Sequence, residues 1–131
     1  SISYDIGGLV GLNLDNSTVS NSYSTGSVAG GSGSYQIGGL VGDNFTSTVS
    51  TCYSTGSVSG TSSVGGLVGR NISIVTNSFW DKQTSGQTTS PSGTGMTTAE
   101  MKQQATFTGW DFTTIWKITE GVSYPKLQWQ P

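Results

Sequence analysis

The chain has 131 residues, of which 61 are serine, threonine or glycine, while 32% are hydrophobic and 9% are charged. This composition excludes the leucine- and isoleucine-rich core on which an ordinary helical bundle or doubly wound α/β domain depends. Histidine is absent and the net charge is −2. The commonest general base and metal ligand is therefore missing, and no basic cluster is present to bind nucleic acid. We expect no cofactor, no metal and no nucleic-acid partner.

Other simple features narrow the possibilities further. No apolar run is long enough to cross a bilayer, so we expect no membrane insertion. Cys52 is the single cysteine, which excludes an internal disulfide. In the sequence repeats described below, Cys52 is at the position equivalent to Ser22 and Ser78. The chain has no histidine that could activate its thiol, so we expect Cys52 to be a structural residue that fills a small space and not a nucleophile.

Three copies of one block, with the pattern I/V-G-G-L-V-G-x-N, begin at Ile6, Ile37 and Val64. The copies are 31 and then 27 residues apart. A second block, T-V-S-x-x-Y-S-T-G-S-V-x-G, begins at Thr18 and Thr48, and a diverged version begins at Ile74. Repeat periods of this length are typical of solenoids, propellers and similar arrays.

Each repeat reads as two or three short strands joined by tight turns. The first block is too short and too rich in glycine for a helix, and its apolar residues fit a buried strand. In the second block Val19 and Tyr23 share one parity and Ser20 and Ser22 the other, which places valine and tyrosine inward. Residues 26–30 form a third short strand between turning glycines.

Stacking the repeats pairs each strand with its own copy, so the sequence predicts an all-β, parallel β-solenoid of about three coils over residues 1–80. The main rival, a propeller, needs blades of about 40 residues, and three of them would not close a ring. In the solenoid, like residues form ladders along the stack. The predicted ladders are Leu9, Leu40 and Leu67; Tyr23, Tyr53 and Phe79; and Asn13, Asn44 and Asn71. The aromatic ladder could instead be a stacking platform for sugars, but its parity with the valines favours the interior.

Residues 81–131 have a different composition, and all four tryptophans lie between residues 80 and 129. We expect a polar loop over residues 81–95, followed by a capping box from Thr97 to Glu100. The capping box predicts a helix of about two turns over residues 101–105. Together with tryptophan-rich strands, this segment is expected to cover the last coil and block further strand pairing. We expect further coils to precede Ser1 in a longer parent protein.

The blocks GGLVGxN and SYSTGSVSG resemble the GLUG motif, a repeat of bacterial and archaeal surface and secreted proteins that include filamentous adhesins. The resemblance covers residues 6–80, and the third repeat departs from the motif after Phe79. The tail resembles the segment that commonly closes such arrays. The resemblance implies an extracellular stalk or adhesive region, secreted or at the cell surface, without known catalytic residues.

We therefore expect a non-enzymatic surface module that binds a glycan or a protein partner. One alternative is a stiff spacer, and another is self-association through the exposed first coil, which would build a dimer or fibre. A remote alternative is glycoside cleavage by Glu100 with Asp111 or Glu120. Glu100, however, already has a structural role as the capping-box partner of Thr97.

Four residues are candidates for partner binding. Tyr35 lies in the variable loop over residues 31–36. Asp43 and Arg70 are at the same position of the repeat as Leu12. The residue type differs at this position between the three copies, whereas the adjacent positions are the same in all three. Trp80 interrupts the repeat and falls on the opposite parity to Phe79, so it lies either beneath the C-terminal segment or exposed.

Overall fold

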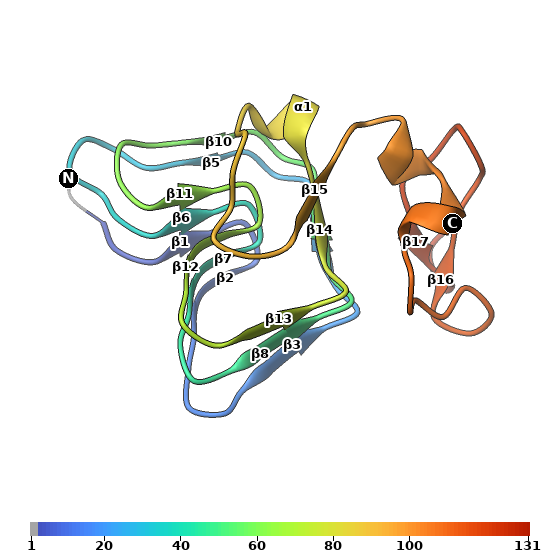
Figure 1. Cartoon of the computed structure of the whole chain (residues 1–131), viewed down its shortest axis with the longest axis horizontal. Coiled ribbons are helices and arrows are strands. Elements are labelled where there is room, and N and C mark those ends of the chain that lie inside the picture. Colours follow the sequence, from blue (N-terminus) through green and yellow to red (C-terminus); the bar gives the residue numbers. More distant parts are fainter. Residues whose placement is uncertain (1–2) are drawn as a thin grey trace.

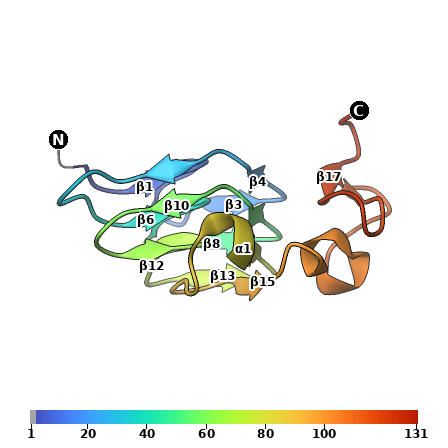
Figure 2. The ribbon, with the colours of Figure 1, turned by 90° about the horizontal axis from the view of Figure 1, so that it is seen from above.

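The computed structural model describes residues 3–131, so the first two residues of the predicted repeat region lie outside the described residues. Short strands stack on one another in three coils, and the C-terminal segment, defined as residues 97–131, lies beside the stack (Figures 1 and 2). None of the helices in residues 3–131 is long and apolar enough to span a membrane.

The strands repeat in a fixed order in each coil. The first coil contains β1 (Ile6–Gly7), β2 (Val10–Asn13), β3 (Thr18–Ser20), β4 (Tyr23–Ser24) and β5 (Val28–Ala29). The second contains β6 (Ile37–Gly38), β7 (Val41–Asn44), β8 (Thr48–Ser50), β9 (Tyr53–Ser54) and β10 (Val58–Ser59). The third contains β11 (Val64–Gly65), β12 (Val68–Asn71), β13 (Ile74–Thr76) and β14 (Phe79–Asp81). The chain then forms α1 (Lys82–Ser85), β15 (Thr94–Met96), the 3₁₀ turns Glu100–Lys102 and Gln104–Thr106, β16 (Trp116–Lys117) and β17 (Lys126–Leu127).

Equivalent strands of successive coils pair in parallel. The five stacked sheets are β1-β6-β11, β2-β7-β12, β3-β8-β13, β4-β9-β14-β15 and β5-β10. The register matches equivalent residues of the repeat, as in Ile6 opposite Ile37 and Ile37 opposite Val64. The parallel β-solenoid of about three coils is therefore confirmed.

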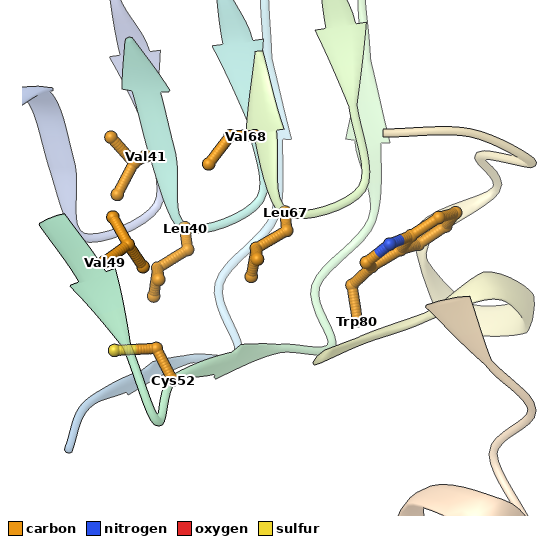
Figure 3. Packing of buried hydrophobic residues seen from close by; sticks show 7 residues of the cluster. All are labelled: Leu40, Val41, Val49, Cys52, Leu67, Val68 and Trp80. Carbon is orange, nitrogen blue, oxygen red and sulfur yellow. The ribbon is translucent and has the colours of Figure 1, made fainter. Parts of the chain in front are cut away.

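The interior of the stack is thin and tightly packed. Its main core consists of Leu40, Val41, Val49, Cys52, Leu67, Val68 and Trp80 (Figure 3). Leu40 and Leu67 are fully buried, whereas Leu9 of the first coil is 48% exposed. The repeated glycines are required by close backbone contact, because a Cβ on Gly38 would lie 2.0 Å from the carbonyl oxygen of Val41.

The asparagines of the repeat also stack along the axis. Asn13 donates from Nδ2 to Oδ1 of Asn44 at 2.9 Å, and Asn44 donates in the same way to Asn71 at 2.8 Å. Asn44 is fully buried and Asn13 is 3% exposed. Asn13 and Asn44 thus have hydrogen-bond partners in a place where water does not reach.

Tyr23, Tyr53 and Phe79 stack in register as the predicted aromatic ladder, but the expectation that they point into the coil is wrong. The backbone turns through the left-handed region just before the fourth strand of each coil, with φ of 50° at Thr51 and similar values at its equivalents. The alternation of side chains is interrupted there. As a result Val49 and Cys52 point into the coil, and Tyr53 points outward into a separate aromatic cluster.

Trp80 points inward, as its opposite parity to Phe79 requires. It stands in register with Ser54, is 3% exposed and packs in the main core. Figure 3 shows its ring beyond Leu67, at the end of the row that begins with Leu40. The small serine of the earlier coils is thus replaced by a large ring that closes the interior at the end of the stack.

The region expected to be a polar loop contains regular structure. The Asp81 side chain accepts from the backbone nitrogens of Gln83 and Thr84 and caps α1, which ends at Gly86 with φ of 72°. β15 then pairs in parallel with β14. Stacking therefore continues beyond residue 80 as a partial fourth level.

The helix expected over residues 101–105 is replaced by two 3₁₀ turns. The capping box does form, since Thr97 N donates to Glu100 Oε2 at 2.9 Å and Glu100 N donates to Thr97 Oγ1 at 3.2 Å. Gln103, however, is extended, with φ of −123°. A segment this short makes too few i→i−4 bonds to offset the nucleation cost of an α-helix.

The C-terminal segment packs on a flank of the stack, at the right of Figure 1, and not over its end. Met101, Phe107, Trp110 and Trp116 cover the outward aromatic ladder of the solenoid. The expected tryptophan-rich strands amount to one antiparallel pair, β16 with β17, which contains Trp116. This packing leaves Tyr53 1% exposed and Phe79 5% exposed, so these rings offer no surface platform for sugars.

Candidate binding groove

One flank of the solenoid carries outward side chains from different coils. Leu12, Asp43 and Arg70 stand opposite one another on β2, β7 and β12. Two positions further along, Leu14 and Phe45 follow the stacked asparagines and again point outward, as the alternation along a strand requires. Parallel stacking thus sets residues about 30 positions apart in the chain side by side.

Asp43 and Arg70 form a bidentate ion pair between adjacent coils. Arg70 Nη2 lies 2.5 Å from Asp43 Oδ2, and Arg70 Nε donates to Asp43 Oδ1 at 3.1 Å. The Asp43 side chain is 3% exposed, whereas that of Arg70 is 44% exposed. The hydrogen bond to Asp43 raises the pKa of Arg70 above its ordinary value. The guanidinium also lies over the ring of Phe45, 5.8 Å from its centroid.

Two residues at the corner before the first strand of each coil extend this polar network. Asp5 and Gln36 occupy equivalent left-handed positions, with φ of 55° at each. In the amide orientation that satisfies both neighbours, the Gln36 nitrogen donates to Asp5 Oδ1 at 2.7 Å and its oxygen accepts from Arg70 Nε at 2.9 Å. Desolvation, and secondarily the nearby Asp43 carboxylate, raise the pKa of Asp5 above its ordinary value, although Arg70 lowers it. The four polar side chains form a continuous chain across the flank.

Two tyrosines border the polar network. The rings of Tyr4 and Tyr35 stack with centroids 5.2 Å apart and an interplanar angle of 20°. Both are accessible, with exposures of 64% for Tyr4 and 42% for Tyr35. Equivalent tyrosines of two coils therefore present an aromatic pair to solvent.

These features meet at a shallow depression of about 370 Å³, here called the groove. The groove is lined by Tyr4, Asp5, Leu12, Leu14, Gln36, Asp43, Phe45 and Arg70. Tyr35 adjoins it through its stacking on Tyr4.

Three of the four residues expected to bind a partner, Tyr35, Asp43 and Arg70, come together at the groove. The fourth, Trp80, is buried in the core and has no place on the surface. Gln36 belongs to the variable loop that was a candidate for binding, whereas Tyr4, Asp5, Leu14 and Phe45 were not expected at the site. A usable signal was present for Leu14 and Phe45 alone, because the residue after each stacked asparagine is apolar in all three copies although it points outward.

The carboxylates considered for glycoside cleavage lie in the C-terminal segment and serve local turns. Glu100 accepts from the Thr97 backbone, and Glu120 Oε1 accepts from Gln104 N at 2.8 Å. Asp111 Oδ1 accepts from Thr113 N and Thr114 N. None of the three lines the groove. Over residues 3–131 no group of three histidine, cysteine, aspartate or glutamate side chains is placed to hold a metal ion.

Comparison with known proteins identifies the repeats. The GLUG motif family matches residues 2–29 and 33–59, which are the first two coils. A protein named "Putative Gly-rich membrane protein" from Evansella cellulosilytica is 44% identical over 125 residues, 87% of this chain. The protein named "Halomucin" from Haloquadratum walsbyi is 36% identical over 163 residues, 95% of this chain.

Both relatives are much longer than this chain, which covers 14% of the first and 2% of the second. No solved structure matches the chain significantly. The matched family is a repeat motif, and no catalytic family is indicated. The sequence copies, their in-register stacking and the family match agree, and the chain therefore carries GLUG motif repeats.

Proposed function

We propose that the chain is a non-enzymatic, extracellular module that adheres to a glycan or protein partner through the groove. The observation that carries the proposal is the convergence around one depression of Tyr35 and Asp43 from the second coil and Arg70 from the third. Kinship with a protein named as a membrane protein and with a halomucin supports a place outside the cytoplasm.

The scaffold suits such a role because it holds the groove rigidly. Leu12, Asp43 and Arg70 lie on strands whose neighbours in the stack fix them in register. A preorganised site loses little conformational entropy when a partner binds. The flank that bears Tyr23, Tyr53 and Phe79 is covered by the C-terminal segment, which leaves the groove flank open for a partner.

A retention assay tests the proposal. The chain is passed over immobilised glycans, cell-wall polymers and extracellular matrix proteins, and the variant Tyr4→Ala is compared with Trp129→Ala. Trp129 is a matched control, because it is also an exposed aromatic residue, at 78%, but does not line the groove. We expect retention of the wild-type chain and Trp129→Ala, and loss for Tyr4→Ala. A folded chain that is retained on no surface would favour the spacer role.

Self-association is a second candidate, favoured by the first coil. Within the described residues its strands pair on one side only, with the second coil. Such strand edges are templates for another chain, and Leu9 adds an exposed apolar side chain there. Sedimentation over a range of concentrations separates the candidates, since edge pairing gives a mass that rises with concentration and adhesion by a monomer does not.

A further inference from the structure

We infer that the groove takes a neutral saccharide, bound by the linked side chains of Asp5, Gln36 and Arg70 beside the aromatic rings of Tyr4 and Phe45. The inference rests on the proposed binding function and specifies its ligand. The charge balance, the hydrogen-bonding groups and the apolar surface of the groove each favour such a ligand.

The charges of the groove oppose each other at close range. Both Asp43 oxygens face the Arg70 guanidinium, and Asp5 accepts from the Gln36 amide. An acidic ligand at Arg70 would lie near two carboxylates, and a cationic ligand at Asp5 would lie near the guanidinium. In either case like-charge repulsion would offset the attraction. The arrangement therefore favours a ligand without net charge.

The same side chains supply donors and acceptors that match hydroxyl groups. A guanidinium has five N–H donors, and its bonds to Asp43 and Gln36 use those on Nε and Nη2. A carboxylate accepts at several sites, so Asp5 has further capacity beyond Gln36. A hydroxyl both donates and accepts, and adjacent hydroxyls of a sugar ring can bridge a donor and an acceptor. A polyhydroxylated ligand thus satisfies both ends of the polar chain.

Apolar surface lies directly beside this polar chain. Leu12 is 42% exposed, and the outward ring of Phe45 lies under Arg70. The stacked pair of Tyr4 and Tyr35 offers an accessible aromatic face, which attracts the polarised C–H groups of a sugar ring. A volume of about 370 Å³ is at the small end of ligand pockets, which suits one or two sugar units of a longer chain.

The test is calorimetric titration of the whole chain with pairs of oligosaccharides that are alike in structure but differ in charge. One pair is galactose oligomers against galacturonate oligomers, and the other is N-acetylglucosamine oligomers against glucosamine oligomers. Neutral mannose and glucose oligomers complete the panel. We expect at least one neutral oligomer to bind, and at least tenfold weaker binding by the charged member of its pair.

Variants of groove residues test whether the saccharide binds in the groove. Tyr4→Ala and Arg70→Lys should each weaken it about tenfold or more. Arg70→Lys keeps the charge beside Asp43 but loses the planar fork. Trp129→Ala, which removes an exposed aromatic ring outside the groove, should bind as the wild type does. Thermal unfolding of each variant checks folding, and the exposed Tyr4 gives a second readout if Arg70→Lys proves unstable.

Several outcomes would overturn the inference. Tighter binding of the galacturonate or glucosamine oligomers would contradict the ligand class while leaving the groove as the site. Neutral binding that survives both Tyr4→Ala and Arg70→Lys would place the saccharide elsewhere. If no saccharide binds but the chain is still retained on a protein surface through Tyr4, the inference fails and the proposed function stands. If a folded chain binds nothing at all, both fail.

Discussion

The side-chain nitrogen of Asn44 donates a hydrogen bond to Oδ1 of Asn71, one coil further along the stack, at 2.8 Å. The same nitrogen lies 3.1 Å from the carbonyl oxygen of Ile74, and Oδ1 of Asn44 accepts from Asn13. Asn44 therefore connects all three coils. Because it is fully buried, water cannot replace a bond that is lost.

Asn44→Ala should lower the free energy of unfolding by about 2–4 kcal/mol, because it leaves Asn13 without its buried acceptor and removes several bonds at once. Asn71→Ala is the matched control. Asn71 ends the ladder and is only half-buried, so its removal should cost roughly half as much. Chemical denaturation of the two variants measures the difference. Equal losses would show that the central position has no special weight.

Gly26 and Gly56 occupy the same column but differ in what lies next to them. A Cβ on Gly56 would lie 1.9 Å from the carbonyl oxygen of Gly26, whereas a Cβ on Gly26 would meet no heavy atom within 4 Å. Gly56→Ala should therefore destabilise the chain by about 1–3 kcal/mol through overpacking. Gly26→Ala should be neutral or stabilising by about 0.4–1 kcal/mol, because alanine has less backbone freedom when unfolded. Thermal denaturation of both variants checks this, and the opposite order would contradict the stacking.

Trp80 fills the interior at the end of the stack, so replacing it with serine, the residue at this position in the earlier coils, should destabilise the fold. Trp80→Ser should cost about 3–5 kcal/mol, the range for removing a large buried ring. Trp80→Phe should cost less, since the indole nitrogen has no hydrogen-bond partner within residues 3–131. Denaturant titration measures both. A Trp80→Ser variant as stable as the wild type would mean that the ring does not fill the core.

Cys52 is expected to be replaceable and unreactive. Its sulfur lies 3.1 Å from the carbonyl oxygen of Ser50, and the equivalent Ser78 hydroxyl donates in the same way to Thr76. Cys52→Ser should therefore change the free energy of unfolding by less than about 1 kcal/mol. Burial raises the pKa of the thiol to about 11, so alkylation at pH 8 should be slow until the chain unfolds. Rapid alkylation of the folded chain would contradict this burial.

Asp81 joins the solenoid to the C-terminal segment and should make stability depend on pH. Burial alone would raise its pKa, but hydrogen bonds from Tyr124, Thr84, Thr98 and Gln83 outweigh burial and hold the pKa below 3.8. A carboxyl whose pKa is lower in the folded chain stabilises the fold above its unfolded value, and this stabilisation disappears as the pH falls through the folded value.

Asp81→Asn should consequently be less stable than the wild type at pH 7, by about 1–3 kcal/mol. The difference should narrow as the pH falls below about 4, where the wild-type carboxyl begins to protonate. Thermal unfolding of both chains between pH 7 and pH 2 measures this convergence. A stability difference that stays constant down to pH 2 would show that the charge of Asp81 contributes nothing.

The repeat copies predicted the solenoid because the same residue type at equivalent positions of the copies indicates the same structural environment in each coil. Glycine, leucine and asparagine recur where backbones touch, where the core lies and where amides stack. The alternation rule failed at Thr51, since a single left-handed residue reverses which side chains face inward. Neither threonine nor asparagine at that corner reveals such a turn as a glycine would.

The groove was predictable only in part. The variable column drew attention to Asp43 and Arg70, and strand stacking makes their contact follow directly. Tyr4, Asp5 and Gln36 lie before the first strand of their coils, and the way that corner folds against β2 and β7 depends on tertiary packing. The sequence also did not predict which flank the C-terminal segment covers, because the apolar residues of this segment do not indicate the face of the solenoid on which they pack.

Cross-linking across the first two coils tests the in-register stack most directly. In a Cys52→Ser background, Ser20→Cys with Ser50→Cys places two thiols on directly paired residues of β3 and β8, within the Cα separation that a disulfide requires. Ser20→Cys with Thr48→Cys shifts one thiol by two residues, about 6.6 Å along the strand. Under mild oxidation, mass spectrometry should show an intramolecular disulfide in the first pair and none in the second. Bridging of the shifted pair, with the matched pair left reduced, would contradict the stacking that builds the groove.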